Sequence, residues 1–214
     1  MLVILGRTCS GKDKTVNELI TNHGFAKLVT YTTRPMRDGE RQDAIYHFIS
    51  EKEFLQKIDN GFFAEWKSYD TEFGTWYYGT ALEDLENAED NTVIILTPDG
   101  FRDVKDKLNN KVTSIYIYAN NKTIKKRLVE RGDNPKEAVR RFEQDMIDFK
   151  GLENEVDRIV YNNDGTDIGE VIDKILKFVR WYYKNRRITN LKVYCFVMKM
   201  KSRKERVMKN ESNA

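Results

Sequence analysis

The sequence predicts an α/β protein in which helices flank a parallel β-sheet. Short apolar segments alternate along the chain with charged or amphipathic helical segments, which is typical of a parallel sheet. Hydrophobic residues make up 40% of the 214 residues, which is enough apolar material for a core. We expect five strands, at residues 3–5, 25–31, 92–96, 112–118 and 158–161.

Helical segments separate these strands. Residues 12–22 carry Val16, Leu19 and Ile20 at helical spacing. Ser50 and Glu53 form the pattern of a capping box at the start of a helix over residues 51–60. The other expected helices cover residues 101–108, 122–130, 135–149 and 168–183.

Composition limits the class of protein. No apolar run approaches the roughly 20 residues that span a bilayer, and the first five residues lack the basic front of a signal peptide. Cys9 and Cys195 lie far apart in sequence and suggest neither a disulfide framework nor a zinc site. We therefore expect a cytoplasmic protein with no membrane partner.

The charge is distributed unevenly. The net charge is +3, yet residues 184–214 carry ten basic and two acidic residues, so the preceding residues are mildly acidic. We interpret residues 184–214 as a basic C-terminal extension without a required role. Contact with nucleic acid or an acidic partner through this extension is the alternative.

A phosphate-binding motif follows the first expected strand. Residues 6–12 (GRTCSGK) match the G-x-x-x-x-G-K part of a P-loop and lie between a strand and a helix, as the motif requires. Its glycines let backbone N–H groups surround a phosphate, and its lysine reaches the β- and γ-phosphates. The residues expected to bind ATP here are Gly6, Thr8, Ser10, Gly11, Lys12, Asp13 and Lys14.

Asp13 departs from this motif. It stands where a P-loop has Ser or Thr, whose hydroxyl supports Mg²⁺. Mg²⁺ keeps several of its waters in proteins, so Asp13 could hold the ion through a water.

Later segments resemble the guanylate kinase family. Residues 30–40 (TYTTRPMRDGE) and 46–48 (YHF) resemble the segment with which that family binds a nucleoside monophosphate. Further resembling blocks follow in the family's order, at residues 61–66, 77–80, 126–132 and 159–163. Because the blocks occur in order over about the first 180 residues, the resemblance is far more specific than the P-loop alone.

This resemblance implies the fold of the P-loop nucleoside monophosphate kinases. Its divisions here would be a domain of residues 1–183 with a five-stranded core (1–30, 81–119 and 149–183), an α+β insertion that binds the monophosphate (31–80) and a helical lid (120–148). The implied reaction transfers the γ-phosphoryl group of ATP to GMP or dGMP, with Mg²⁺ as the metal. Nucleotides would be the partners of a monomer or homodimer.

The resemblance places the acceptor phosphate near two arginines and two tyrosines. Arg34 and Arg37 would present guanidinium groups to the phosphate of GMP, and Tyr46 and Tyr78 would donate hydroxyl hydrogen bonds. Glu65 would accept hydrogen bonds from the guanine N1–H and amino group, which adenine does not offer. The remaining base contacts would come from Thr30, Thr80 and Thr97.

Thr97 is the second departure. The family usually has an aspartate at this position, and here Thr97 is followed by Pro98 and Asp99, which could turn toward the base instead. A kinase for another nucleoside monophosphate therefore remains an alternative. A catalytically inactive binding module is a further alternative, against which Lys12 argues.

Arginines of the expected lid complete the site. Phosphoryl transfer needs positioning and positive charge around the transferred group, and the resemblance places Arg127, Arg131 and Arg141 there, with Arg140 as an alternative to Arg141. Ion pairs on solvated helices are the alternative reading. With Lys12 and Arg34 these arginines form the expected catalytic set, and Asn162 is expected near the adenine of ATP.

Overall fold

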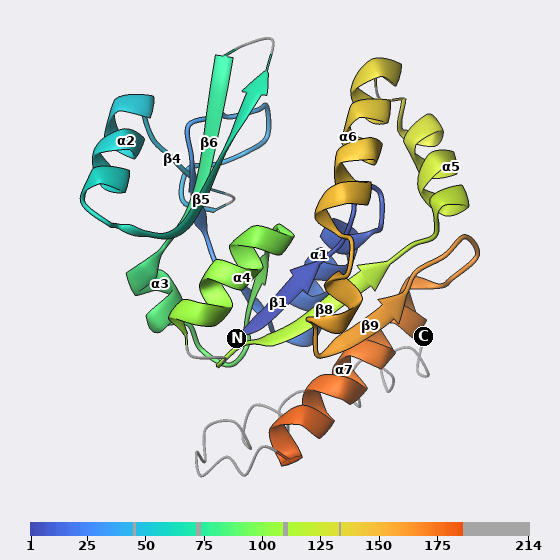
Figure 1. Ribbon diagram of the computed structural model, residues 1–214. Helices are drawn as coiled ribbons and strands as arrows, with labels where there is room; N and C mark the ends of the chain where they lie inside the picture. The colour runs from blue at the N-terminus through green and yellow to red at the C-terminus, as the bar shows by residue number, and fades with distance from the viewer. Residues whose placement is uncertain (45, 72–73, 109–110, 133, 186–214) are drawn as a thin grey trace.

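A five-stranded parallel sheet lies at the centre of the computed structural model (Figure 1). Described are residues 1–44, 46–71, 74–108, 111–132 and 134–185. The strand order is β2-β7-β1-β8-β9. The strands are β1 (Leu2–Leu5), β2 (Ala26–Lys27), β7 (Thr92–Ile95), β8 (Thr113–Tyr118) and β9 (Arg158–Tyr161). The prediction of an α/β fold with a five-stranded parallel sheet is confirmed.

Strand β1 is buried on both faces because it is the central strand. Its side chains alternate, so Leu2 and Ile4 pack into one hydrophobic cluster and Val3 and Leu5 into another. Helices α1 (Lys12–His23) and α7 (Ile168–Asn185) supply the first cluster, whereas α3 (Leu82–Glu86) and α4 (Pro98–Lys107) supply the second. The sheet is thus the middle layer of three.

A second sheet of four strands stands above one end of the first (Figure 1). Its order is β4-β3-β6-β5, and α2 (Glu51–Asp59) packs Phe54 against it. The strands are β3 (Thr30–Thr32), β4 (Tyr46–Phe48), β5 (Phe63–Thr71) and β6 (Gly74–Ala81). The single strand expected at residues 25–31 is therefore wrong: the chain leaves the central sheet after β2 and enters the second sheet at β3.

Helix ends follow their capping residues. The Ser50 hydroxyl accepts a hydrogen bond from the Glu53 N–H, as the capping-box pattern predicts. Thr97 caps α4, so this helix begins at Pro98, before the expected start. Helices α5 (Asn121–Arg131) and α6 (Pro135–Asp148) follow β8, and a short 3₁₀ helix (Leu152–Asn154) precedes β9.

Helices α5 and α6 form a pair opposite the second sheet, on the other side of the carboxyl end of β1 (Figure 1). Ile124 and Leu128 of α5 pack with Ala138 of α6, and Cys9 joins this cluster from the loop after β1. The pair is therefore attached directly to the P-loop.

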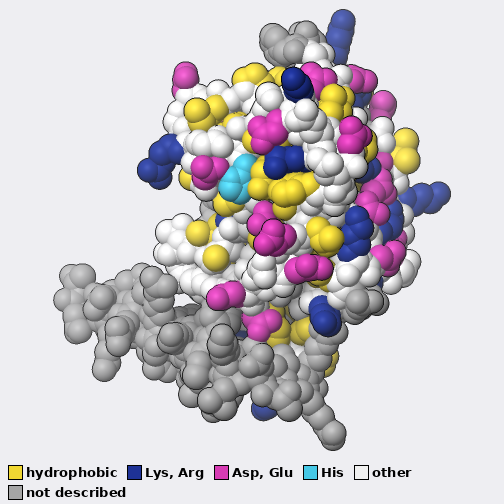
Figure 2. Space-filling model, turned by 90° about the vertical axis from the view of Figure 1, so that its left-hand side faces the viewer, with side chains coloured by type: hydrophobic (Ala, Val, Ile, Leu, Met, Phe, Trp, Pro, Cys, Tyr) yellow, Lys and Arg dark blue, Asp and Glu magenta, His cyan; other side chains and the backbone are white. Residues whose placement is uncertain are grey.

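The face that carries α2 and α3 shows acidic and basic side chains mixed together (Figure 2). Its described part therefore presents no block of one sign. Among the described residues, no helix has the length and apolar character needed to cross a bilayer. The basic extension, apart from the two residues that end α7, lies outside the described residues, as does Cys195.

We predict that Gly79→Ala destabilises the fold. A Cβ at Gly79 in β6 would lie 2.9 Å from ring carbons of Phe54 and Phe63, whose rings stack with centroids 4.4 Å apart. Overpacking of this kind costs about 1–3 kcal/mol, measurable as the free energy of unfolding in urea. The control is Gly169→Ala, where the new methyl meets only the carboxylate end of Asp167; equal effects of the two changes would contradict the packing argument.

Candidate active site

The P-loop has the conformation that its glycines allow. Cys9 and Gly11 have φ of 57° and 92°, in the left-handed region. A Cβ at Gly6 would lie 2.4 Å from the Ser10 hydroxyl, and one at Gly11 would lie 2.3 Å from the side-chain nitrogen of Asn162. Both glycines of the motif are thus required, and the loop predicted from the sequence is present between β1 and α1.

Asn162 and Arg127 hold the carbonyl groups of this loop. The Asn162 amide donates to the Ser10 carbonyl oxygen at 2.8 Å, and Arg127 donates to the Cys9 carbonyl oxygen at 3.1 Å. Arg127 also donates to the carbonyl oxygen of Asn163 at 3.4 Å. The structure therefore brings both predicted residues to the P-loop, where they bind its backbone.

Arg7 ties the loop to the helix pair and was not predicted. It is only 5% exposed and donates to the Asn121 side chain and the Met146 sulfur, both at 2.9 Å, and to the Ala119 carbonyl oxygen at 2.6 Å. The neighbouring Thr8 N–H donates to the Asp145 carboxylate of α6 at 2.6 Å. A variable motif position gives no signal for such contacts, since they join residues 112 or more positions apart.

Lys12 and Asp13 begin helix α1. The Lys12 ammonium lies 3.6 Å from the Asp13 carboxylate, and the Asp13 side chain is 78% exposed. Lys14 is also exposed. Asp13 is thus an exposed carboxylate at the start of α1. Such a carboxylate can bind Mg²⁺ through a water, because this ion keeps several of its waters in proteins. Within the described residues, no group of three or more His, Cys, Asp or Glu side chains forms a metal cluster.

Arg34 is buried and is held by an ion pair with the half-buried Glu40. Both guanidinium ends donate to the Glu40 carboxylate, at 2.8 and 2.9 Å, and Arg34 is 5% exposed. Glu40 also accepts the Arg37 backbone N–H at 2.8 Å. The hydrogen bonds from Arg34 lower the pKa of Glu40 to about 2, and those bonds raise the pKa of Arg34. Glu40 lies in the segment that resembles the family, but the sequence predicts no binding role for it.

Aromatic rings surround this pair. The Arg34 guanidinium carbon lies 5.5 Å from the ring centroids of both Tyr46 and Phe48, within cation–π distance. The rings of Tyr46 and Tyr78 meet edge to face at 6.0 Å. Arg34, Tyr46 and Tyr78 are thus together as expected, whereas the side chain of Arg37 is exposed at their edge.

Glu65 lies where β5, β6 and α4 meet. The Thr80 hydroxyl donates to one carboxylate oxygen at 2.5 Å, and a Cβ on Gly100 would lie 2.8 Å from the other oxygen. Burial raises the pKa of Glu65, and the hydrogen bond from Thr80 opposes that rise. Glu65 and Thr80, which were both expected at the base, are therefore bonded to each other, and Gly100 makes room for the Glu65 carboxylate. Thr30 lies in β3 of the same sheet and is half-buried.

Thr97 and Asp99 have structural partners at this end. The Thr97 hydroxyl oxygen accepts the Gly100 N–H at 3.2 Å. The Asp99 carboxylate accepts from Arg102 at 2.8 Å and from Lys67, and these partners lower its pKa. Asp99 is therefore bound to Arg102 and Lys67 and does not replace the base-binding aspartate.

The arginines of α6 are held by their own helix. Arg140 and Arg141 both donate to Glu137, at 2.8 and 2.7 Å, and lower its pKa to about 2. Both arginines are exposed, as is Arg131 at the end of α5. The ion pairs that the sequence offered as the alternative reading are present for Arg140 and Arg141.

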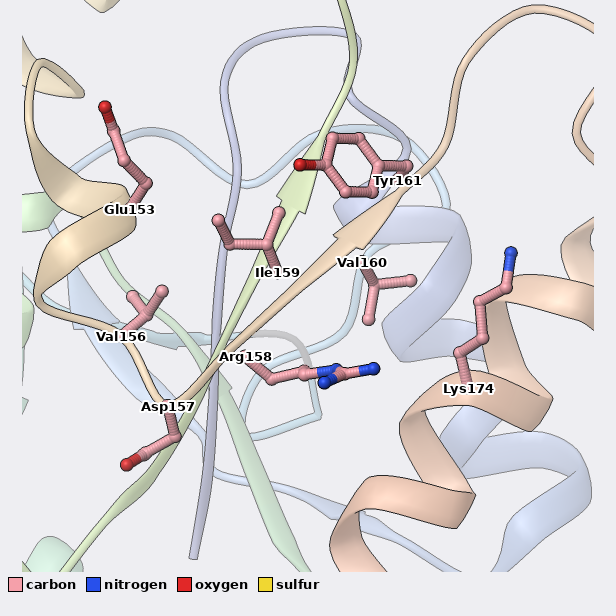
Figure 3. Close-up of a pocket in the computed structure, with 8 residues that line it drawn as sticks. All are labelled: Glu153, Val156, Asp157, Arg158, Ile159, Val160, Tyr161 and Lys174. Carbon is pink, nitrogen blue, oxygen red and sulfur yellow. The ribbon is translucent and has the colours of Figure 1, made fainter.

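A hollow of about 570 Å³ lies beside β9 (Figure 3). Lys174 approaches it from α7, opposite Glu153 and Val156 (Figure 3). No P-loop residue and no residue expected to bind GMP lines it, so we do not place a nucleotide there. Its lining consists of Glu153, Val156, Asp157, Arg158, Ile159, Val160, Tyr161 and Lys174.

A parallel sheet whose central strand ends in a P-loop defines a P-loop nucleotide-binding protein, with its site at the carboxyl ends of the strands. The sequence model of guanylate kinase matches residues 1–179, and the chain belongs to the guanylate kinase family.

Curated relatives and a solved structure are similar over most of their lengths. The guanylate kinase of Helicobacter hepaticus is 31% identical over 85% of this chain and 91% of its own. That of Campylobacter jejuni strain RM1221 is 31% identical over 82% and 87%. The crystal structure of guanylate kinase from Anaplasma phagocytophilum superposes with a TM-score of 0.59, 25% identity and 85% coverage of each chain.

We predict that Glu40→Gln lowers the melting temperature at pH 7, because it leaves the buried Arg34 without its anion. The pKa of Glu40 is about 2 in the folded protein against 4.5 as the ordinary value. Its stabilisation is thus present above pH 4.5 and is lost as the pH falls toward 2, so the difference between variant and wild type should shrink over that range.

The matched control for this measurement is Glu137→Gln. The pKa of Glu137 is lowered to the same value, but its arginine partners are 49% and 58% exposed and solvent screens them. The control should change the melting temperature much less at pH 7. A Glu40→Gln effect that is small or independent of pH would contradict the proposed strength of the buried pair.

Proposed function

We propose that this protein transfers the γ-phosphoryl group of ATP to GMP or dGMP, giving ADP and the guanosine diphosphate. One observation carries the proposal. The P-loop follows β1, and Glu65 lies against Gly100 of α4, which follows the neighbouring strand β7, while Arg34, Tyr46 and Tyr78 cluster at the second sheet. Membership of the guanylate kinase family supports it.

The P-loop would bind the ATP phosphates. Arg127 and Asn162 take up loop carbonyl oxygens. The N–H groups of Thr8 and Ser10 have partners within the protein, so the other N–H groups of the loop and the start of α1 would face an anion. Lys12 adds a mobile cation for the β- and γ-phosphates. Phosphoryl transfer depends mainly on such positioning and charge neutralisation.

The second sheet would bind GMP. Tyr46 and Tyr78 would donate to its phosphate, beside the fixed guanidinium of Arg34 and the exposed one of Arg37. Glu65 would accept the N1–H and amino hydrogens of guanine, while Thr80 and Thr30 stand beside the base. Thr97 keeps its hydroxyl proton for a base atom while its oxygen caps α4.

Asp13 would hold Mg²⁺ through a water, and the bound ion would neutralise negative charge on the phosphate oxygens. We assign the monophosphate-binding region to residues 31–80 and the lid to residues 120–148. The second sheet and the α5–α6 pair stand on either side of the carboxyl end of β1, which supports this division (Figure 1). Closure of such a lid would exclude water from the transferred group, and Arg131 and Arg141 would reach it from α5 and α6 on closure.

A coupled ADP-release assay against the eight common nucleoside monophosphates and deoxynucleoside monophosphates tests the function. We expect GMP and dGMP to be the best acceptors. Lys12→Ala should abolish turnover with unchanged circular dichroism, because it removes the cation between the donor phosphates. A preference for adenine or a pyrimidine would refute the guanine assignment, and near-normal kcat in Lys12→Ala would refute the phosphate cradle.

We predict that Glu65→Gln lowers kcat/KM for GMP by about 10- to 100-fold. The glutamine amide would place a donor against guanine donors and leave polar groups unpaired. The rate with AMP, whose base has neither donor, should fall far less. The control is Glu83→Gln on α3, an exposed carboxylate outside the site. A uniform loss over all acceptors would show that Glu65 supports the fold and does not select the base.

A further inference from the structure

Lys27 lies at the end of β2, where the chain leaves the central sheet for the second sheet. Its side chain is half-buried, and its ammonium nitrogen is 5.0 Å from the ring centroid of Tyr46. The Arg34 guanidinium carbon lies 5.5 Å from the same centroid. Two cations therefore meet at one tyrosine of the acceptor site.

The charge of Arg34 is already balanced. Glu40 binds both ends of the Arg34 guanidinium, so the Arg34–Glu40 pair has no net charge. A phosphate dianion at Tyr46 needs cationic partners beyond that pair. Arg37 is exposed, whereas Lys27 is already half-buried at the ring.

Two carboxylates act electrostatically on Lys27. Burial lowers the pKa of Lys27, while the carboxylates of Asp13 and Glu40 both raise it. Asp13 belongs to the start of α1, and Glu40 to the segment after β3. The charge of Lys27 is thus favoured by one anion from each of these two segments.

We propose that Lys27 is a phosphate-binding residue of this enzyme, whose ammonium contacts the acceptor phosphate of GMP on the side that faces the P-loop. The proposal rests on the function proposed above. It gives the departure at Asp13 a consequence, because this carboxylate favours the charged form of Lys27. Lys27 would then neutralise charge where the two phosphates approach each other.

Lys27→Met tests the proposal, because methionine keeps the length and apolar stem and removes the charge. We expect KM for GMP to rise about 10- to 100-fold and KM for ATP to change less than about twofold. Lys27→Arg should restore most of the affinity for GMP. Inhibition by guanosine, which has no phosphate, should be the same in wild type and Lys27→Met.

Lys57→Met is the matched control. Lys57 also lies over aromatic rings, 4.0 Å from the Phe62 centroid and 5.5 Å from that of Tyr31, but on α2. It should leave both KM values unchanged. If Lys27→Met does not fold, as judged by circular dichroism, Lys27→Gln takes its place in the same measurements.

Three outcomes overturn the proposal: an unchanged KM for GMP, an equal loss of GMP and guanosine affinity, or no rescue by arginine. The last two would assign Lys27 to packing of the Tyr46 ring. Wild-type turnover of GMP is measured in the same series. Its absence would refute the proposed function, whereas normal wild-type turnover with an unaffected Lys27→Met variant refutes the inference alone.

Discussion

Asn162 and Arg127 donate to the carbonyl oxygens of Ser10 and Cys9, and these bonds decide which way the peptide groups of the P-loop point. A loop that binds phosphate must turn its N–H groups outward, so its carbonyl oxygens need partners on the other side. Those partners come from α5 and from the end of β9. The Ser10 hydroxyl and the Asn162 amide also leave no room for a Cβ at Gly6 and Gly11, respectively. The site therefore exists only when the central sheet and the α5–α6 pair are both assembled.

The part of the candidate site at the second sheet is organised by charge rather than by backbone. Arg34 and Glu40 form an ion pair whose guanidinium packs against two aromatic rings. This pair fixes the segment after β3 without adding net charge. Glu65 is fixed in a similar way by the hydrogen bond from Thr80, and Gly100 leaves room for its carboxylate. Rigid placement of a few polar groups is what separates one base or phosphate from another.

Local signals were sufficient for part of this architecture. The P-loop, the Ser50 cap and the alternation of strands and helices depend on neighbouring residues, so the sequence predicts them directly. Contacts between distant residues left no such trace. Arg7 is an unspecified position of the P-loop motif, and Asp145 belongs to no motif. The split of residues 25–31 between two sheets is invisible because both halves have the same strand-like pattern. By contrast, Arg140 and Arg141 both form ion pairs with Glu137, an acid within four residues of each. Such local pairs are visible in the sequence.

The central place of β1 has a consequence for synthesis of the chain. Leu2 is paired with Val93 on one side and with Thr113 on the other, so the first strand to leave the ribosome waits for neighbours made about a hundred residues later. The apolar side chains of β1 are exposed during that interval, and the P-loop lacks Arg127 and Asn162 until still later. Nascent chains shorter than this would be bound by chaperones rather than by nucleotide. Acquisition of the nucleotide site is thus among the last events of translation, although its motif is among the first residues translated.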